Sequence, residues 1–315
     1  MLKLFERLYV FLCSHFQPFE VWVRHCYYFF LKGKVNISKL DNEEPKRDVE
    51  KLDKSLLFSY VDSLGIKNGD ILIVHSSMDA LSQFEVTPKE IIDWLLNIVG
   101  PEGTLCMPAF PMYRAKDYSI DEVTGEQVIA YDVKKSPCWT GMLPNLFLRY
   151  PGVIRSEFPY NPLAAKGKHA IEMMKDNLLG DKPHGIHSSW DYCVNHDAKI
   201  LYLGCPMYHS LTVSHISEDI DEDWPIDDWY VSQIYEIICV NGQRKNVTVN
   251  IPNEYYARYY SEYYHEKELL RNGLATIKTI GICPIGYISN TTKLIRYYRS
   301  YSYSKRIAYK LPRRK

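Results

Sequence analysis

The chain has 315 residues, of which 46% are hydrophobic and 24% charged, and its 38 basic residues balance its 38 acidic ones. This length suffices for one large hydrophobic core, and the balance excludes the strong positive field of a nucleic-acid-binding protein. The eight cysteines include no CxxC pair, which favours reduced thiols in the cytoplasm over a disulfide framework or a zinc ribbon.

Residues 1–40 are predicted to be an amphipathic, aromatic N-terminal extension. Lys3 and Arg7 fall on one helical face, while Leu4 and Phe5 belong to the apolar remainder. The apolar stretches are shorter than the roughly 20 residues that a spanning helix needs. The pattern is typical of a helix lying on a membrane surface. Packing on the protein's own core, or on a second subunit, is an equal alternative.

The polar segment 41–53 is predicted to be a linker, and the folded domain is expected to span 54–298. Short apolar runs at 71–75, 104–108 and 199–204 predict buried strands, the first of them parallel to its neighbours.

Helical patterns separate these strands. Thr87 and Glu90 form a capping box with Pro88 at the first helical position, and a helix is predicted over 91–99. The alternation of strands and helices predicts an α/β layered sheet with helices on both faces. Further helices are predicted at 144–150, at 168–176 and from Ser188.

Asn241-Gly242 is the strongest hairpin signal in the sequence. It stands between apolar runs at 234–240 and 247–251. We expect an antiparallel hairpin that is inserted into the main sheet or appended to it.

Reactive side chains gather directly after the strand at 199–204, among them His209, Thr212, His215 and Glu218. Ligands of open α/β sheets bind at the carboxyl ends of strands. In a helix, Thr212, His215 and Glu218 share one face, where the carboxylate orients the imidazole as a general base. The alternative is a capped helix start that carries a surface histidine.

Several segments resemble, in order and spacing, the motifs of one known family. These segments are 69–78, 103–110, 151–156 with 164–167, and 203–205 with 212–218. Over about residues 54–298 the chain resembles the aminoglycoside 3-N-acetyltransferase family. The resemblance implies the fold of that family and acyl transfer from acetyl-CoA to an amine, without a metal.

The resemblance assigns roles to individual residues. His215 would deprotonate the acceptor amine, and Glu218 would orient it or bind the acceptor's ammonium group. The loop after the first strand would lie along the pantetheine arm of acetyl-CoA, which makes His75, Ser76, Ser77 and Met78 the candidate cofactor-binding residues.

The chain also departs from the family's pattern. His209 stands where the resistance enzymes carry an aspartate, and it is our third candidate catalytic residue. Phe158 and Asn161 replace two histidines, so we expect an acceptor less cationic than an aminoglycoside. Candidate substrate-binding residues are Thr212, Tyr160 and Asn161.

An amino sugar fits these departures, in particular a nucleotide-linked or lipid-linked one used in surface polysaccharide biosynthesis. The basic, tyrosine-rich tail 299–315 and residues 1–34 would then hold a cytoplasmic enzyme on the inner face of the membrane. Alternatively, the tail covers a sheet edge. A homo-oligomer is compatible with the sequence.

Three other functions stay open at this point. One is an aminoglycoside-modifying resistance enzyme, and another is an inactive membrane-associated scaffold with the same fold. The third is a metal-dependent hydrolase using His184, His187, His209, His215 and Glu218, although no standard zinc-binding spacing occurs.

Overall fold

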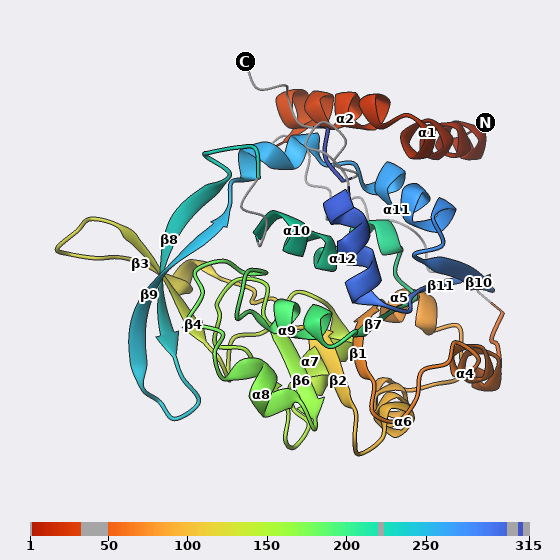
Figure 1. The fold of residues 1–315 in the computed structure, drawn as a ribbon, viewed down its shortest axis with the longest axis horizontal. Helices are drawn as coiled ribbons and strands as arrows, with labels where there is room; N and C mark the ends of the chain where they lie inside the picture. The colour runs from red at the N-terminus through yellow and green to blue at the C-terminus, as the bar shows by residue number, and fades with distance from the viewer. Residues whose placement is uncertain (1, 33–49, 220–223, 301–307, 311–315) are drawn as a thin grey trace.

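The structure is a computed structural model and describes residues 2–32, 50–219, 224–300 and 308–310. A seven-stranded mixed sheet forms the centre of the molecule (Figure 1). In spatial order its strands are β10 (Thr276–Ile280), β11 (Cys283–Ile288), β7 (Lys199–Leu203), β1 (Ile71–Ser76), β2 (Thr104–Pro108), β6 (Leu163–Gly167) and β5 (Ile154–Arg155).

The three strands predicted from apolar runs, β1, β2 and β7, lie side by side and parallel at the centre of this sheet. Leu72 of β1 pairs with Leu105 of β2 on one side and with Lys199 of β7 on the other. The flanking strands β11 and β6 are antiparallel to the central three. The carboxyl ends of β1 and β7 therefore lie at the same edge, which is where the site forms.

Helices cover both faces of the sheet, which confirms the predicted fold class. Along β1, Leu72 and Val74 belong to the hydrophobic cluster on one face, and Ile71 and Ile73 belong to the cluster on the other. This alternation follows from the two-residue period of a strand. The first cluster includes residues of α4 (Lys54–Asp62), α5 (Met78–Leu81), α6 (Pro88–Val99) and α7 (Met142–Phe147), and the second includes residues of α8 (Ala170–Met174), α9 (Ser189–Asn195) and α12 (Thr291–Ser300).

Two of these helices begin at the predicted signals. The Thr87 side chain accepts from the backbone N–H of Glu90, and the Glu90 carboxylate accepts from that of Thr87, so the capping box of α6 is complete. The Ser188 side chain caps α9 through the N–H of Asp191.

A second sheet lies beside the first and has the order β3 (Tyr118–Ile120), β4 (Gln127–Asp132), β8 (Tyr230–Ile238) and β9 (Arg244–Pro252). β8 and β9 form the predicted hairpin, with Gly242 at φ 84° in its turn. The prediction that this hairpin joins the main sheet was wrong. β8 instead pairs in parallel with β4. Residues of the second sheet form a separate, smaller hydrophobic core.

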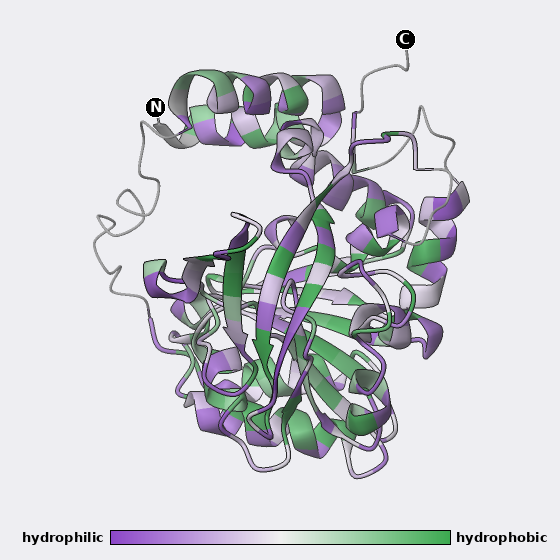
Figure 2. Ribbon diagram, turned by 90° about the vertical axis from the view of Figure 1, so that its left-hand side faces the viewer, coloured by the Kyte–Doolittle hydropathy of each residue, from purple (hydrophilic) through white to green (hydrophobic). Residues whose placement is uncertain are grey.

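The N-terminal extension consists of α1 (Leu2–His15), α2 (Gln17–Cys26) and the π-helix η1 (Tyr27–Leu31), all packed against the rest of the chain. They contact α11 (Glu262–Arg271) and the 3₁₀ helix η5 (Glu254–Tyr259). Figure 2 shows α1 and α2 as an outer layer above the body of the molecule.

None of the helices in the described ranges has the length and apolar character needed to cross a membrane. Most of the predicted linker 41–53 lies outside the described residues, as does most of the predicted tail 299–315. α4 begins at Lys54 with Asp53 as its N-cap, at the start predicted for the folded domain.

Candidate active site

His215 and Glu218 lie at the junction of two short helices beyond the end of β7. The 3₁₀ helix η4 (Thr212–His215) continues into α10 (Ile216–Asp219). His215 Nδ1 lies 2.7 Å from Glu218 Oε1, at hydrogen-bond distance, as the three-residue spacing predicts. Glu218 is buried, whereas the His215 side chain is 28% exposed. The ring is therefore held from one side and is accessible from the other.

The pKa of His215 is shifted upward by its neighbours. Burial alone lowers this pKa, but Glu218 and then Asp219 raise it by more, so the net pKa is above 6.5. The imidazole is thus a stronger base than an isolated histidine.

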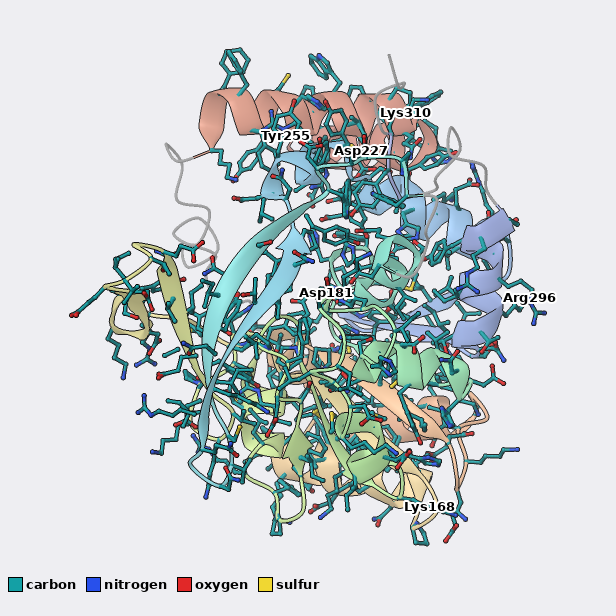
Figure 3. All side chains as sticks on the ribbon, turned by 60° about the vertical axis from the view of Figure 1, so that its left-hand side comes forward. Lys168, Asp181, Asp227, Tyr255, Arg296 and Lys310 are labelled. Atoms are coloured by element: carbon teal, nitrogen blue, oxygen red, sulfur yellow. The ribbon has the colours of Figure 1, made fainter. Side chains whose placement is uncertain are left out.

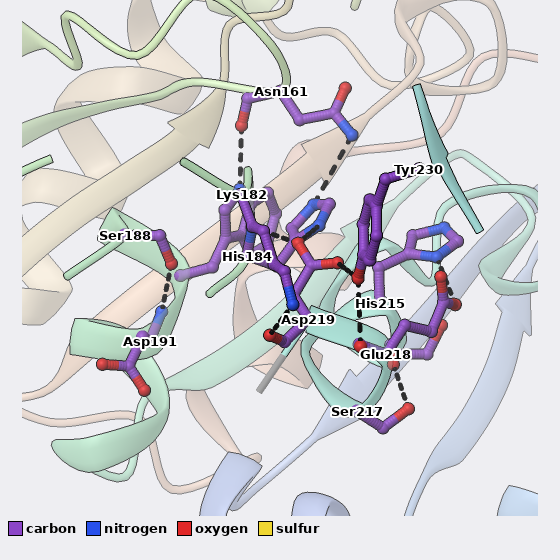
Figure 4. Close-up of polar contacts among 12 residues, drawn as sticks. Asn161, Lys182, His184, Ser188, Asp191, His215, Ser217, Glu218, Asp219 and Tyr230 are labelled. Carbon is purple, nitrogen blue, oxygen red and sulfur yellow. Dashed lines mark hydrogen bonds and ion pairs between the residues drawn. The ribbon is translucent and has the colours of Figure 1, made fainter. Parts of the chain in front are cut away.

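A second histidine and carboxylate lie next to this pair (Figure 4). The rings of His184 and His215 are 5.5 Å apart between centroids. His184 Nδ1 lies 3.3 Å from Asp219 Oδ2, and the same oxygen accepts the backbone N–H of His184 at 2.7 Å. Tyr230 donates its hydroxyl to Asp219 Oδ1 at 2.7 Å. Burial lowers the pKa of His184, with Asp219 opposing this shift.

Both histidines line one cavity of about 200 Å³, which we call the His215 cavity. Asn161 brings its side-chain amide to 3.5 Å from His184 Nε2, and its φ of 52° is a conformation that asparagine tolerates better than most residues. The remaining lining is largely aromatic and includes Tyr160, Trp229, Tyr256 and Tyr309, together with Asn253 and Glu254.

A second cavity of about 370 Å³ lies at the end of β1, and we call it the His75 cavity. All four predicted cofactor-binding residues line it, namely His75, Ser76, Ser77 and Met78. Trp139, Thr140 and Gly141 form part of its lining, together with Thr212 and His209.

Two buried polar atoms at this cavity, His75 Nε2 and Ser76 Oγ, have no hydrogen-bond partner among the described residues. Burial lowers the pKa of His75 to about 3, so its ring is neutral and stacks on Tyr202. Unpaired buried polar atoms are uncommon in folded proteins and suit a site that a ligand completes.

The predicted site residues therefore divide between two cavities. His215, Tyr160 and Asn161 line one of them. Thr212 and His209 line the other, although Thr212 was predicted to bind the acceptor with the first group. The turn η4 joins the two, with Thr212 at one end and His215 at the other.

His209 lies apart from the His215–Glu218 pair. Its side chain is 56% exposed, and its Nδ1 lies 2.7 Å from Glu262 of α11. Glu262 also forms an ion pair with Arg24 of α2. The catalytic role of His209 stays a prediction. Phe158 is buried in the core of the second sheet and does not line the His215 cavity.

Sequence analysis missed much of the His215 cavity. His184 was considered only as a metal ligand, and Trp229, Tyr256 and Tyr309 were not singled out as site residues. Tyr309 pairs with Tyr260 in an isolated bridge. The abundance of tyrosine, 26 residues, was the only sequence signal for this lining. Within the described ranges, no group of three or more His, Cys, Asp or Glu is arranged to hold a metal ion.

Comparison with known proteins identifies the family. The model of the family described as aminoglycoside 3-N-acetyltransferase matches residues 73–294, which is more than two thirds of the chain. The chain belongs to this family. The resemblance noted in the sequence motifs is thereby confirmed.

Among aminoglycoside 3-N-acetyltransferases, the chain is similar to the enzyme named aminoglycoside N(3)-acetyltransferase IX of Micromonospora chalcea, with 32% identity over 189 residues. The match covers 58% of this chain and 66% of that relative. For two further relatives the matched share of their length is 56% and 57%. The chain thus spans less than two thirds of the length of these curated relatives.

Solved aminoglycoside 3-N-acetyltransferases share the fold. One is AAC-IIIb in a binary complex with CoASH, with a TM-score of 0.64, 22% identity, and coverage of 79% of this chain and 95% of that one. Another is AAC-VIa bound to sisomicin, with a TM-score of 0.64, 19% identity, and coverage of 78% and 96%. At these identities the likeness shows the fold alone.

Proposed function

We propose that this protein is an N-acetyltransferase that moves the acetyl group of acetyl-CoA to an amino group on a sugar ring. One observation carries the proposal. His215 is paired with the buried carboxylate of Glu218 and is the last residue of the turn η4. The two ends of this turn line two different cavities. His215 lines one cavity and Thr212, three residues before it, lines the other, so one cosubstrate can occupy each cavity. Membership in the aminoglycoside 3-N-acetyltransferase family supports this reaction.

In the proposed reaction, neutral His215 takes a proton from the acceptor amine through Nε2 as the amine nitrogen attacks. The nitrogen lone pair attacks the thioester carbonyl carbon, the carbon–sulfur bond breaks, and the leaving CoA thiolate takes the proton from the His215 imidazolium. The products are an acetamide and free CoA. Glu218 stabilises the imidazolium that forms, since its carboxylate is already at Nδ1.

We assign the His75 cavity to acetyl-CoA. It contains all four residues that match the family's pantetheine loop, and two of its buried polar atoms have no hydrogen-bond partner in the part of the chain that the structure describes. A structural neighbour was solved with CoASH, which supports a CoA site in this fold.

We assign the His215 cavity to the acceptor and propose two acceptor classes. The names of the relatives and the neighbour bound to sisomicin favour an aminoglycoside, and they support a resistance enzyme better than a polysaccharide enzyme. The cavity itself favours a smaller acceptor, because about 200 Å³ is less than the roughly 300 Å³ at which sites for drug-sized ligands begin. Its aromatic lining suits stacking on a single amino sugar.

The thiols favour a reducing compartment. All eight cysteines are free, and six of them are buried. We therefore propose a cytoplasmic location.

The test is a thiol-release assay with acetyl-CoA against aminoglycosides, nucleotide amino sugars and free amino sugars. His215→Ala is expected to lower turnover about 10²-fold or more, the scale of a lost general base. His196→Ala, an exposed histidine at the end of α9, is the matched control. Unchanged turnover in His215→Ala removes this residue from its role.

Two further measurements separate the competing functions. An inactive scaffold gives no heat of binding with acetyl-CoA in calorimetry. A metal-dependent hydrolase loses its activity in a strong chelator, whereas the proposed transferase keeps it.

A further inference from the structure

The outward surface of the N-terminal helices is apolar and aromatic. Of the large hydrophobic side chains in residues 2–32, several are more than half exposed, and Phe29 reaches 80%. The most exposed include Leu4, Phe5, Phe16, Trp22, Phe29 and Phe30. We call this surface of α1, α2 and η1 the N-terminal face. Soluble monomers seldom concentrate exposed apolar side chains in this way without a binding role.

The inward side of the same helices is already occupied. Cys13 and Val21 are buried, and the Glu20 carboxylate accepts from backbone N–H groups at the start of α11. Arg24 forms an ion pair with Glu262. The helices are thus anchored on this chain, and the exposed side chains remain after that anchoring.

Among the described charged residues at the N-terminal face, Arg7 and Lys310 are basic and exposed, whereas Arg24 and Lys32 are already ion-paired. Glu20 is buried against α11, which leaves Glu6 as the acid that faces solvent on α1 and α2. Arg7 on α1 is exposed. The C-terminal segment returns to this region, because the backbone N–H of Lys310 donates to the carbonyl of Tyr259. Figure 3 shows Lys310 beside the N-terminal helices, and the sequence after it ends in Arg313, Arg314 and Lys315.

We propose that the N-terminal face binds the surface of an anionic lipid bilayer. Exposed Phe and Trp beside basic side chains are the chemistry of helices that lie in the headgroup region. A second copy of the chain is the other candidate occupant. In a two-fold symmetric contact the same patch meets itself, so Arg7 and Lys310 would approach their own copies. Anionic headgroups offer those charges partners instead.

The short helix η5 contacts both this face and the His215 cavity. On one side of η5, Glu254 and Tyr256 line the cavity. On the other, Tyr259 packs edge-on against His25 of α2 at 4.7 Å. Lys32 after η1 is paired with Glu254 itself. If the proposed function holds, an enzyme bound in this way presents its acceptor cavity close to the lipid surface, within reach of a lipid-linked amino sugar.

Cosedimentation with phosphatidylcholine vesicles, with and without phosphatidylserine, tests the lipid-binding face. The wild-type protein is expected to sediment with the anionic vesicles and to be released by high salt. The triple variant Phe5→Gln, Trp22→Gln, Phe29→Gln should bind at least about tenfold more weakly, because burial of these side chains in lipid is lost. The matched control is Ile120→Gln, Val123→Gln, which changes exposed apolar residues near β3 and should bind as the wild type does.

Each remaining outcome bears on the proposal. Failure of the wild type to bind anionic vesicles overturns it. The proposal is also overturned if sedimentation equilibrium shows that the wild type is a dimer, the triple variant is a monomer, and neither protein binds vesicles. If the triple variant fails to fold by circular dichroism, Arg7→Glu replaces it and should weaken binding to anionic vesicles alone. Vesicle binding does not require turnover. If the protein binds vesicles but releases no thiol from acetyl-CoA, the proposed function is refuted and the inference of lipid binding stands.

Discussion

The contact between His215 and Glu218 determines which nitrogen of the His215 ring is free, and it shifts the pH at which the ring becomes neutral. Glu218 lies at Nδ1, which leaves Nε2 free for the proton transfer that we propose. A general base acts only in its neutral form. Because the net effect of burial, Glu218 and Asp219 is to raise the pKa of His215 above 6.5, kcat/KM is expected to rise with pH through that elevated pKa.

Glu218→Gln tests this directly. The substitution removes the main cause that raises the pKa of His215 and leaves burial, which lowers this pKa, opposed only by the smaller effect of Asp219. The acidic limb of the kcat/KM profile should therefore move to lower pH, while the plateau falls about tenfold or more with the loss of charge support. Glu236→Gln, on an exposed ion pair of β8, is the control. An acidic limb that keeps its midpoint would contradict the assignment.

His184 should contribute to acceptor binding without serving as the base. It is fully buried, its lowered pKa keeps the ring neutral near pH 7, and it lines the His215 cavity. Loss of one hydrogen bond to the acceptor is worth about 1 kcal/mol, so His184→Gln should raise the acceptor KM roughly fivefold. The KM for acetyl-CoA should not change. Steady-state kinetics with each substrate varied in turn decide the point, and an unaltered acceptor KM would refute it.

Among the elements, α6 and α11 show why one helix start is predictable and another is not. The cap of α6 comes from Thr87 and Glu90, three residues apart. Ser261, the N-cap of α11, makes no capping bond with its own side chain. The Glu20 carboxylate caps α11 instead, because it accepts from the backbone N–H groups of Glu262, Tyr263 and Tyr264. Glu20 precedes Glu262 by 242 residues. A short-range sequence pattern cannot predict a cap from such a distant residue.

Glu20→Ala is expected to destabilise the whole protein. Glu20 is 2% exposed, and its loss leaves buried helix donors without a partner. We expect a loss of about 1 to 3 kcal/mol in the free energy of unfolding, the range for an unsatisfied buried group. Urea denaturation followed by circular dichroism measures it. Glu6→Ala, on exposed α1, should lie within about 0.5 kcal/mol of wild type. Equal stability of the two variants would mean that Glu20 does not act as this cap.

At the scale of the whole molecule, the sequence predicted where strands lie better than it predicted which strands pair with each other. The apolar runs of β1, β2 and β7 locate buried strands because a strand covered on both faces is apolar throughout. The hairpin of β8 and β9 was predicted from its turn, but its parallel pairing with β4 was not. That pairing joins segments about a hundred residues apart and depends on tertiary packing.

The site was predictable to the same extent. The His215–Glu218 pair lies within one turn of chain, so local spacing predicts its contact. The His75 to Met78 loop was chosen from the family resemblance, and its four residues line one cavity because they are consecutive in the chain. His184 and Tyr309 reach the His215 cavity from distant parts of the sequence. Local patterns could not place them there, since their position depends on how the second sheet and the C-terminal segment pack.

The two cavities make a last prediction about the molecule as a unit. A ligand that binds only the folded state stabilises it by about 2.7 kcal/mol at a hundredfold excess over its Kd. Acetyl-CoA alone should therefore raise the Tm by roughly 5 °C, since about 1 kcal/mol shifts the Tm of a protein near this size by about 2 °C. Ser77→Phe places a ring in the His75 cavity and keeps the backbone bond from Ser77 to Leu203, so it should lower this shift by half or more at the same acetyl-CoA concentration. Ser63→Phe, at the exposed end of α4, should retain the full shift. Differential scanning fluorimetry measures all three proteins, and an equal shift in Ser77→Phe would place acetyl-CoA elsewhere.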